Sequence, residues 1–186
     1  MNISKIINTR RAVYPSQFKE GDIDKEIIKI ILENANTAPT HRMTQPWFFK
    51  VYKNDSKNSL GIEMTEAFEL YSKTESPQKK KKILQKCEQS NCIIAIFMKR
   101  DPKESVPEWE EIAATAIAVQ NMWLTCVEYE IGCYWSTPKY IDKMNDFFML
   151  KKNERCLGFF YMGKYDHSEL ESKERESINV KTEWNF

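Results

Sequence analysis

A short polar loop between two prolines carries the side chains of this chain that are best suited to chemistry. The segment from Ala38 to Trp47 reads Ala-Pro-Thr-His-Arg-Met-Thr-Gln-Pro-Trp, so hydrogen-bonding groups are concentrated between Pro39 and Pro46. Proline has no amide donor and disfavours a helical residue before it, so a helix must end near Ala38. Polar loops between rigid elements often carry function, and we expect that of this one, which carries Thr40, His41, Arg42, Thr44 and Gln45.

Two arginines near the start of the chain form a second group, Arg10-Arg11-Ala12. A guanidinium fork matches the oxygens of a phosphate, so this segment predicts a phosphate clamp. On local grounds the alternative of a solvated basic pair stays open. The chain has no Walker loop or GxGxxG motif and only five glycines. We therefore expect any bound nucleotide to be held by side chains.

Composition excludes several classes of function. The chain has 186 residues with a net charge of +1, which suits one domain over residues 1–186 and favours neither nucleic acid nor a membrane surface. No apolar run approaches the roughly 20 residues of a membrane span. Five cysteines without CxxC spacing, and no signal peptide, predict reduced thiols in a cytoplasmic protein. The two histidines lie far from any cysteine cluster, so we expect no metal site.

Apolar spacing and turn residues predict the elements that position these groups. We expect helices over residues 2–9, 24–38, 59–73, 77–89, 110–131 and 138–149, and a loop over residues 13–22. We expect strands over residues 47–52, 92–98 and 156–163, and a short strand and turn over residues 132–138. The strand over residues 92–98 is apolar enough to be buried on both faces.

The helix expected over residues 110–131 is apolar on nearly every side, which predicts burial on every side. It is either a central core helix or a helix with one face in a subunit interface. The tail of residues 165–186 is polar and charged, a composition typical of disorder. Its end carries Trp184 and Phe186, which suggest that it docks on another surface.

Taken together, these motifs resemble the nitroreductase family of FMN-dependent oxidoreductases. Arg10-Arg11-Ala12 corresponds to the family's Arg-Arg-Ser, and Ala38-Pro39 followed by Gln45-Pro46-Trp47 corresponds to its Ala-Pro-Ser and Gln-Pro-Trp. The apolar helix, the turn at residues 132–137 and Leu-Gly-Phe-Phe-Tyr-Met-Gly at residues 157–163 follow in register. The similarity spans roughly residues 3 to 164. The segment 106–110 and Trp135 resemble a small bacterial subgroup in particular.

The resemblance implies an α/β (α+β) three-layer fold, in which a mixed sheet is flanked by helices. It implies a homodimer with the long helix at its interface, two FMN molecules between the subunits, and a C-terminal tail that wraps over the partner. It also implies ping-pong chemistry, in which NAD(P)H gives a hydride to flavin N5 and leaves before a nitroaromatic, quinone or similar acceptor binds. The sequence does not choose between NADH and NADPH.

The resemblance also implies which residues bind FMN. Arg10 is the first choice for the phosphate, Ala12 lacks the hydroxyl of the usual Ser, and Lys164 is either a second phosphate cation or an exposed lysine. Thr37 and His41 would reach the flavin of the other subunit. The full expected set is Arg10, Arg11, Ala12, Thr37, His41, Gln45, Trp135, Ser136, Thr137 and Lys164. No side chain is expected to be an obligatory catalytic acid, because the flavin carries the chemistry.

One position departs from the family pattern. Many members have a lysine or arginine four residues after the first arginine, near flavin N1 and O2, where this chain has Tyr14. Our hypothesis is that His41 or Arg42 of the partner subunit substitutes for that cation. Two alternatives to the nitroreductase reaction remain. One is another flavin reaction on the same fold, such as enone reduction, dehalogenation or flavin consumption, and the other is a flavin-binding dimer without productive turnover.

Overall fold

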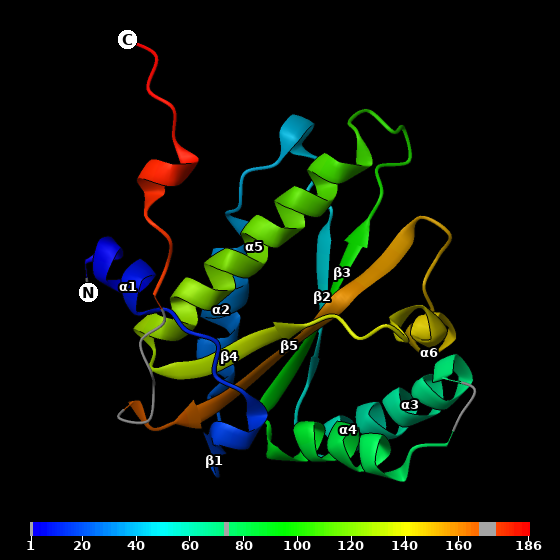
Figure 1. Cartoon of the computed structure of the whole chain (residues 1–186). Coiled ribbons are helices and arrows are strands. Elements are labelled where there is room, and N and C mark those ends of the chain that lie inside the picture. The colour runs from blue at the N-terminus through cyan, green and yellow to red at the C-terminus, as the bar shows by residue number, and fades with distance from the viewer. Residues whose placement is uncertain (1, 73–74, 168–173) are drawn as a thin grey trace.

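A computed structural model describes residues 2–72, 75–167 and 174–186 of the chain (Figure 1). Its strands are β1 (Phe18–Lys19), β2 (Trp47–Tyr52), β3 (Cys92–Lys99), β4 (Ile131–Ser136) and β5 (Glu154–Tyr165). Its α-helices are α1 (Ile3–Thr9), α2 (Lys25–Asn36), α3 (Asp55–Ser72), α4 (Pro77–Gln89), α5 (Glu108–Glu128) and α6 (Asn145–Phe148). Short 3-10 helices are η1 (Pro15–Gln17), η2 (His41–Met43), η3 (Ile141–Met144) and η5 (Ile178–Lys181).

The sheet is built around β5, which pairs with β1, β3 and β4, while β2 pairs with β3 at the edge. All of these pairings are antiparallel. The mixed sheet that the resemblance implied is therefore not formed within the described residues, because none of their strands run parallel. The outer edge of β2 has no neighbouring strand in this part of the chain.

Helices cover both faces of the sheet and make the three layers that the resemblance implied (Figure 1). Side chains of β3 alternate between two cores, as period-2 strand geometry requires. Ile94 and Ile96 pack into the core beneath α2 and α5, whereas Ile93 and Phe97 pack into the core beneath α3 and α4. Seven successive β3 residues, 92–98, are buried, which confirms the prediction of a strand buried on both faces.

Local signals explain where the elements begin and end. The Asp24 side chain accepts the amide of Glu26 and caps α2, and Pro77 opens α4 at its first turn. The predicted loop over residues 13–22 contains η1 and β1. Helix α3 begins at Asp55, four residues earlier than predicted. The helix predicted over residues 138–149 is instead two short pieces, η3 and α6, and ends at Met149 in the left-handed region.

The long helix α5 is only partly a core helix. Ala118 and Met122 are fully buried against α2 and the sheet, but Trp109 and Ile117 are 67% and 40% exposed. The last part of the tail, residues 174–186, leaves the body beside α1 and forms η5, so disorder does not extend over all of it (Figure 1). Residues 168–173 of that predicted tail lie outside the described residues.

All five cysteines are free and buried, as the prediction of reduced thiols requires. In the described part of the chain, no helix combines the length and the apolar character that crossing a membrane requires.

Candidate functional site

The segment Arg10–Ala12 is fixed from two sides. Arg10 follows the last residue of α1, and its guanidinium carbon lies 4.8 Å from the centroid of the Trp123 ring on α5. The Trp123 indole Nε1 also donates to the carbonyl of Arg11 at 3.1 Å. The amide of Val13 donates to the carbonyl of Cys133 on β4 at 3.1 Å. The backbone of the segment is thus tied both to α5 and to the sheet.

The charges at this segment are not balanced by acids. Within the described residues, neither Arg10 nor Arg11 has an ion pair with a carboxylate. Arg11 instead donates to the carbonyls of Asn8 and Arg10. Burial lowers the pKa of Arg10, and the neighbouring charges of Arg175 and Arg11 lower it further. Half-buried guanidinium groups that repel one another are stabilised by an anion, so this donor set fits a phosphate group.

Arg175 is a residue that sequence reasoning did not single out. It follows the undescribed segment of the tail, and its charge acts on Arg10 although it lies far away in the sequence. Lys164, the expected second cation, has its amide bonded to Asn91 Oδ1 at 2.8 Å, and its side chain lies beside Gly21. In the sequence, Arg175 lies in a run of alternating basic and acidic residues. Such a run does not indicate that any one of its residues is functional.

The proline-fenced loop has a strained backbone. Arg42, Met43 and Gln45 have positive φ angles of 52°, 54° and 43°. Non-glycine residues in this region cost roughly 1–2 kcal/mol each, and such strain is concentrated at functional sites. The loop is held internally, because the Gln45 amide donates to Thr40 Oγ1 at 3.2 Å and that hydroxyl bonds with Thr44 at 3.1 Å.

The expected site residues Thr37, His41 and Gln45 lie just before the loop, within it and at its end, and all three are exposed. Thr37 follows the end of α2, and its hydroxyl donates to the carbonyl of Asn34 at 2.8 Å. His41 lies in η2, where its Nδ1 is 2.6 Å from Oε2 of Glu110 on α5. Glu110 is a second residue that sequence reasoning missed, because an acidic residue in the first turn of a helix is ordinarily explained by the helix dipole.

The third part of the expected site, residues 135–137, is positioned by a β-bulge in β5. Leu157 has no partner in the β3–β5 register, which shifts between Ile96 and Phe97. Its carbonyl is thereby free to accept Trp135 Nε1 at 3.0 Å and Thr137 Oγ1 at 3.1 Å. Gly158 has φ of 137°, and a Cβ there would lie 2.3 Å from Trp135 Nε1. The bulge and this glycine together set the position of the turn.

Two of the three parts are connected through packed aromatic side chains. The Trp123 ring, which lies under Arg10, contacts Phe160 edge to face at 5.8 Å between centroids, and Phe160 is the β5 partner of Trp135. His41 and Glu110 lie at the other end of α5. Glu110 precedes Trp123 by thirteen residues, or roughly 20 Å along a helix. Within one chain, the loop and the arginine segment therefore lie apart along α5.

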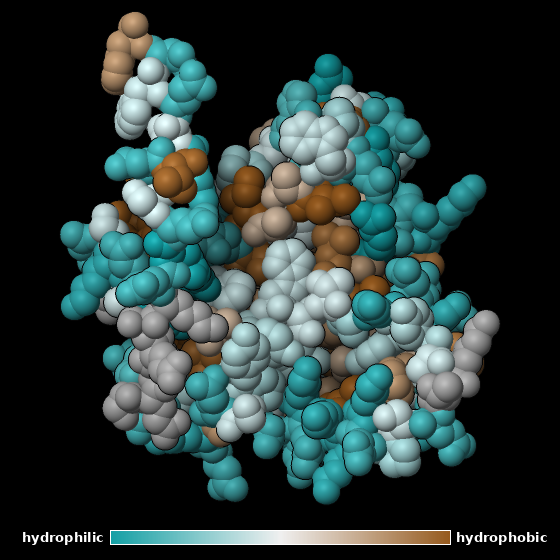
Figure 2. Space-filling view, viewed as in Figure 1, coloured by the Kyte–Doolittle hydropathy of each residue, from teal (hydrophilic) through white to brown (hydrophobic). Residues whose placement is uncertain are grey.

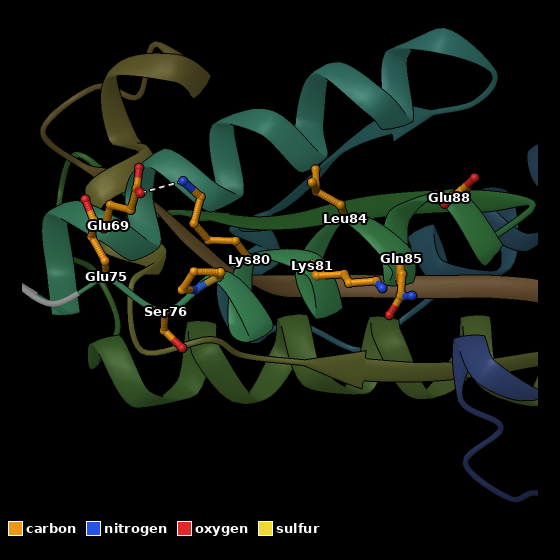
Figure 3. A pocket seen from close by; sticks show the side chains of 9 residues that line it. Glu69, Glu75, Ser76, Lys80, Lys81, Leu84, Gln85 and Glu88 are labelled. Carbon is orange, nitrogen blue, oxygen red and sulfur yellow. Dashed lines mark hydrogen bonds and ion pairs between the residues drawn. The ribbon is translucent and has the colours of Figure 1, made fainter.

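Three pockets of the chain lie elsewhere. One of about 530 Å³ is formed between α3 and α4, and the ion pair of Lys80 with Glu69 is part of its lining (Figure 3). A second of about 490 Å³ lies beside β1, and a third of about 740 Å³, with a largely apolar floor that includes Trp47 and Phe49, lies between α2 and β2. None of them is lined by the ten expected site residues.

Metal and thiol chemistry find no support in the described residues. No group of three or more His, Cys, Asp or Glu side chains there could hold a metal ion. Cys133 lies beneath the arginine segment, and burial raises the pKa of its thiol well above the usual value. Burial also raises the pKa of Cys87, Cys92 and Cys156 to about 12. Protonated thiols are poor nucleophiles and poor ligands.

Comparisons with known proteins point to one family. The model of the nitroreductase family matches residues 7–164. The Bacillus subtilis protein YfhC, provisionally named an NAD(P)H nitroreductase, is 29% identical over 180 residues, which cover 93% of this chain and 89% of that protein.

Solved structures share the fold. A nitroreductase-like family protein from Bacillus cereus has a TM-score of 0.83 at 23% identity, covering 100% of this chain and 96% of that one. A variant of the FMN and NADPH-dependent nitroreductase NfnB from Sphigopyxis sp. strain HMH has a TM-score of 0.78 at 14% identity and covers 100% of both chains. With the family match over most of its length, this chain belongs to the nitroreductase family.

Proposed function

We propose that this protein is an FMN-dependent oxidoreductase that takes electrons from NAD(P)H and gives them to nitroaromatic, quinone or similar conjugated acceptors. One observation carries the proposal for this chain. Arg10 is half-buried over the Trp123 ring, beside two further arginines and with no carboxylate partner among the described residues. Such a cluster is suited to the phosphate of FMN, which carries nearly two negative charges at neutral pH.

The remaining expected residues fit the other end of the cofactor. The turn at Trp135, Ser136 and Thr137 is joined to the arginine segment through Trp123 and Phe160 and is fixed by the Leu157 carbonyl. We assign Arg10, Arg11 and Ala12 to the phosphate end and this turn to the flavin end, with Lys164 as a candidate for additional charge. When bound, FMN supplies the hydride chemistry, and the protein supplies binding and electrostatics.

We further propose that the functional unit is a homodimer with FMN at the interface. His41 lies beside Glu110, at the far end of α5 from Arg10, whereas Thr37 lies closer to the middle of the helix, because its hydroxyl shares the Asn34 carbonyl with the Asn121 amide. In the proposal Thr37, His41 and Gln45 complete the site of the partner subunit. The exposed face of α5 supports such an interface, because apolar side chains gather over part of this helix (Figure 2). Trp109 and Ile117 are among its exposed apolar side chains, and exposed apolar patches of this kind mark interaction sites.

The C-terminal tail supports the same proposal. Trp184 is 69% exposed and Phe186 is fully exposed on a segment that leaves the body of its own chain (Figure 1). We propose that this segment wraps over the partner subunit. The apolar pocket beside β2 is a surface that could receive it, and a strand added parallel to β2 would make the sheet mixed. Five free, buried cysteines agree with a reducing compartment such as the cytoplasm.

The reaction that follows from this arrangement is ping-pong, because donor and acceptor would occupy the same open face in turn. Initial rates of NADH and NADPH oxidation, measured with a quinone or a nitroaromatic at several fixed concentrations, test it. We expect acceptor-dependent oxidation with parallel double-reciprocal lines. Tight FMN binding without any acceptor-dependent oxidation would instead point to a flavin-binding dimer without turnover and would contradict the proposal.

A further inference from the structure

The imidazole of His41 is held from one side by a carboxylate of another element. Its Nδ1 lies 2.6 Å from Oε2 of Glu110, although the two residues are 69 positions apart in the sequence. The Glu110 side chain is 24% exposed, whereas that of His41 is 57% exposed. The contact is thus on the sheltered side of the ring, and the rest of the imidazole faces outward.

Among the described residues, this contact is the one side-chain hydrogen bond between the strained loop and α5. The other loop contacts lead elsewhere: Thr40 and Thr44 bond to each other, and the Pro46 carbonyl accepts the Lys99 amide at the end of β3. Those bonds fix the backbone of the loop. The orientation of the His41 ring depends on Glu110.

The chemistry of the pair determines which ring nitrogen carries the proton. A carboxylate only accepts hydrogen bonds, and the group in contact with Nδ1 of His41 is the Glu110 carboxylate in the first turn of α5. Nδ1 of His41 must therefore be the donor. Nε2 has no hydrogen bond within the described residues and is left for a ligand, as an acceptor when the ring is neutral and as a donor when it is protonated.

We infer that Glu110 is a positioning residue, which holds His41 as the Nδ1–H form and turns Nε2 toward the flavin of the partner subunit. The inference rests on the proposed function, in which His41 contacts that flavin. Two neighbouring acidic residues of α5 do not contribute to holding His41. Glu108 pairs with Arg155 at 3.4 Å on the surface, and Glu111 is buried in an ion pair with Arg100.

The first experiment reads the tautomer directly and needs no cofactor. The chain has only two histidines, so the His41→Asn variant assigns both imidazoles in a long-range ¹⁵N–¹H NMR spectrum. At a pH where the ring is neutral, we expect His41 in the Nδ1–H form in the wild type and in Glu108→Ala. In Glu110→Ala we expect the Nε2–H form that free imidazole side chains favour, and in Glu110→Gln the amide oxygen should restore Nδ1–H. An Nε2–H ring in the wild type, or an unchanged ring in Glu110→Ala, overturns the inference.

The second experiment is a double-mutant cycle on FMN affinity, measured by quenching of FMN fluorescence. We expect Glu110→Ala to weaken FMN binding about three- to tenfold, and to have no further effect in the His41→Asn background. Additive effects would show that Glu110 acts on FMN binding independently of His41 and would overturn the inference. If the wild-type protein binds no FMN, the proposed function fails, whereas the tautomer measurement still decides whether Glu110 orients His41.

Discussion

The guanidinium of Arg10 and the indole of Trp123 form a cation–π contact at 4.8 Å, and the same indole donates to the carbonyl of Arg11. One side chain of α5 thus fixes both the side chain and the backbone of the segment that we assign to the FMN phosphate. Because α5 also carries Glu110 and the exposed face that we assign to the dimer, one helix connects all parts of the proposed site.

Substitution Arg10→Ala should weaken FMN binding by about ten- to a hundredfold, because hydrogen bonds to charged groups contribute roughly 1.5–3 kcal/mol. Loss of the contact with Trp123 should lower the free energy of unfolding by only about 1 kcal/mol. FMN titration and chemical denaturation measure the two effects. Arg155→Ala, which removes a surface arginine paired with Glu108, is the matched control and should leave FMN binding unchanged. Equal affinity of the Arg10 variant and the wild type would refute the phosphate role.

Arg175→Met and Lys164→Met compare the two candidates for a second cation. We expect the Arg175 variant to lose several-fold in FMN affinity and part of the dependence of affinity on salt, because its charge acts on Arg10. The Lys164→Met variant measures directly how much that lysine contributes to FMN affinity. A loss confined to the Lys164 variant would assign the second charge to Lys164 and remove Arg175 from the site.

Ala116→Glu places a charge on the partly exposed face of α5. We expect a folded monomer that binds FMN poorly, because a charge at the centre of an apolar interface stays unpaired. Light scattering after size-exclusion chromatography reports the mass, and circular dichroism reports the fold. Leu70→Glu, at a residue of α3 that is 68% exposed, is the control and should remain dimeric. A stable, dimeric Ala116→Glu protein would contradict this interface.

Buried thiols predict how stability changes at high pH. Burial raises the pKa of Cys87, Cys92 and Cys156 to about 12, from about 9 in the unfolded chain. The stability that comes from keeping these thiols protonated is complete below about pH 9 and is lost as the pH rises toward about 12. Each thiol should lower the free energy of unfolding by up to about 1.4 kcal/mol per pH unit in that window.

Urea denaturation across this window tests the prediction, with Cys87→Ala as the comparison, since it should show a smaller slope with pH. A thiol reagent provides a second readout at neutral pH, where the folded protein should react slowly and the unfolded protein at once. Rapid reaction of the native protein would show that its thiols are accessible and would contradict the burial found here.

The parts of the fold that could be predicted from the sequence are those with a local physical cause. The apolar run of β3 required burial on both faces, and Pro39 required α2 to end before it. The first turn of α3 was missed by the prediction, because that turn is polar and has no apolar spacing. The division of the predicted helix into η3 and α6 could not be foreseen from the spacing of its apolar residues, and nothing in the sequence marks Met149 as left-handed.

The parts of the site that sequence reasoning missed depend on contacts between distant residues. The bond between His41 and Glu110 joins a loop to a helix 69 residues later, and the nearness of Arg175 to Arg10 depends on the path of the tail. Leu157 has no β3 partner because of a register shift between β3 and β5, and its carbonyl bonds to the turn instead. A pattern read along the chain records none of these relationships, whereas the motif residues themselves were recognisable.

The most direct test of the central claim is the visible absorbance spectrum of the purified protein after incubation with FMN and removal of free cofactor, followed by addition of NADH or NADPH without oxygen. We predict a bound flavin spectrum that bleaches with one of the two donors and returns when a quinone or nitroaromatic is added. A protein that retains no flavin, or a bound flavin that neither donor bleaches, would contradict the assignment of this chain as an FMN-dependent NAD(P)H oxidoreductase.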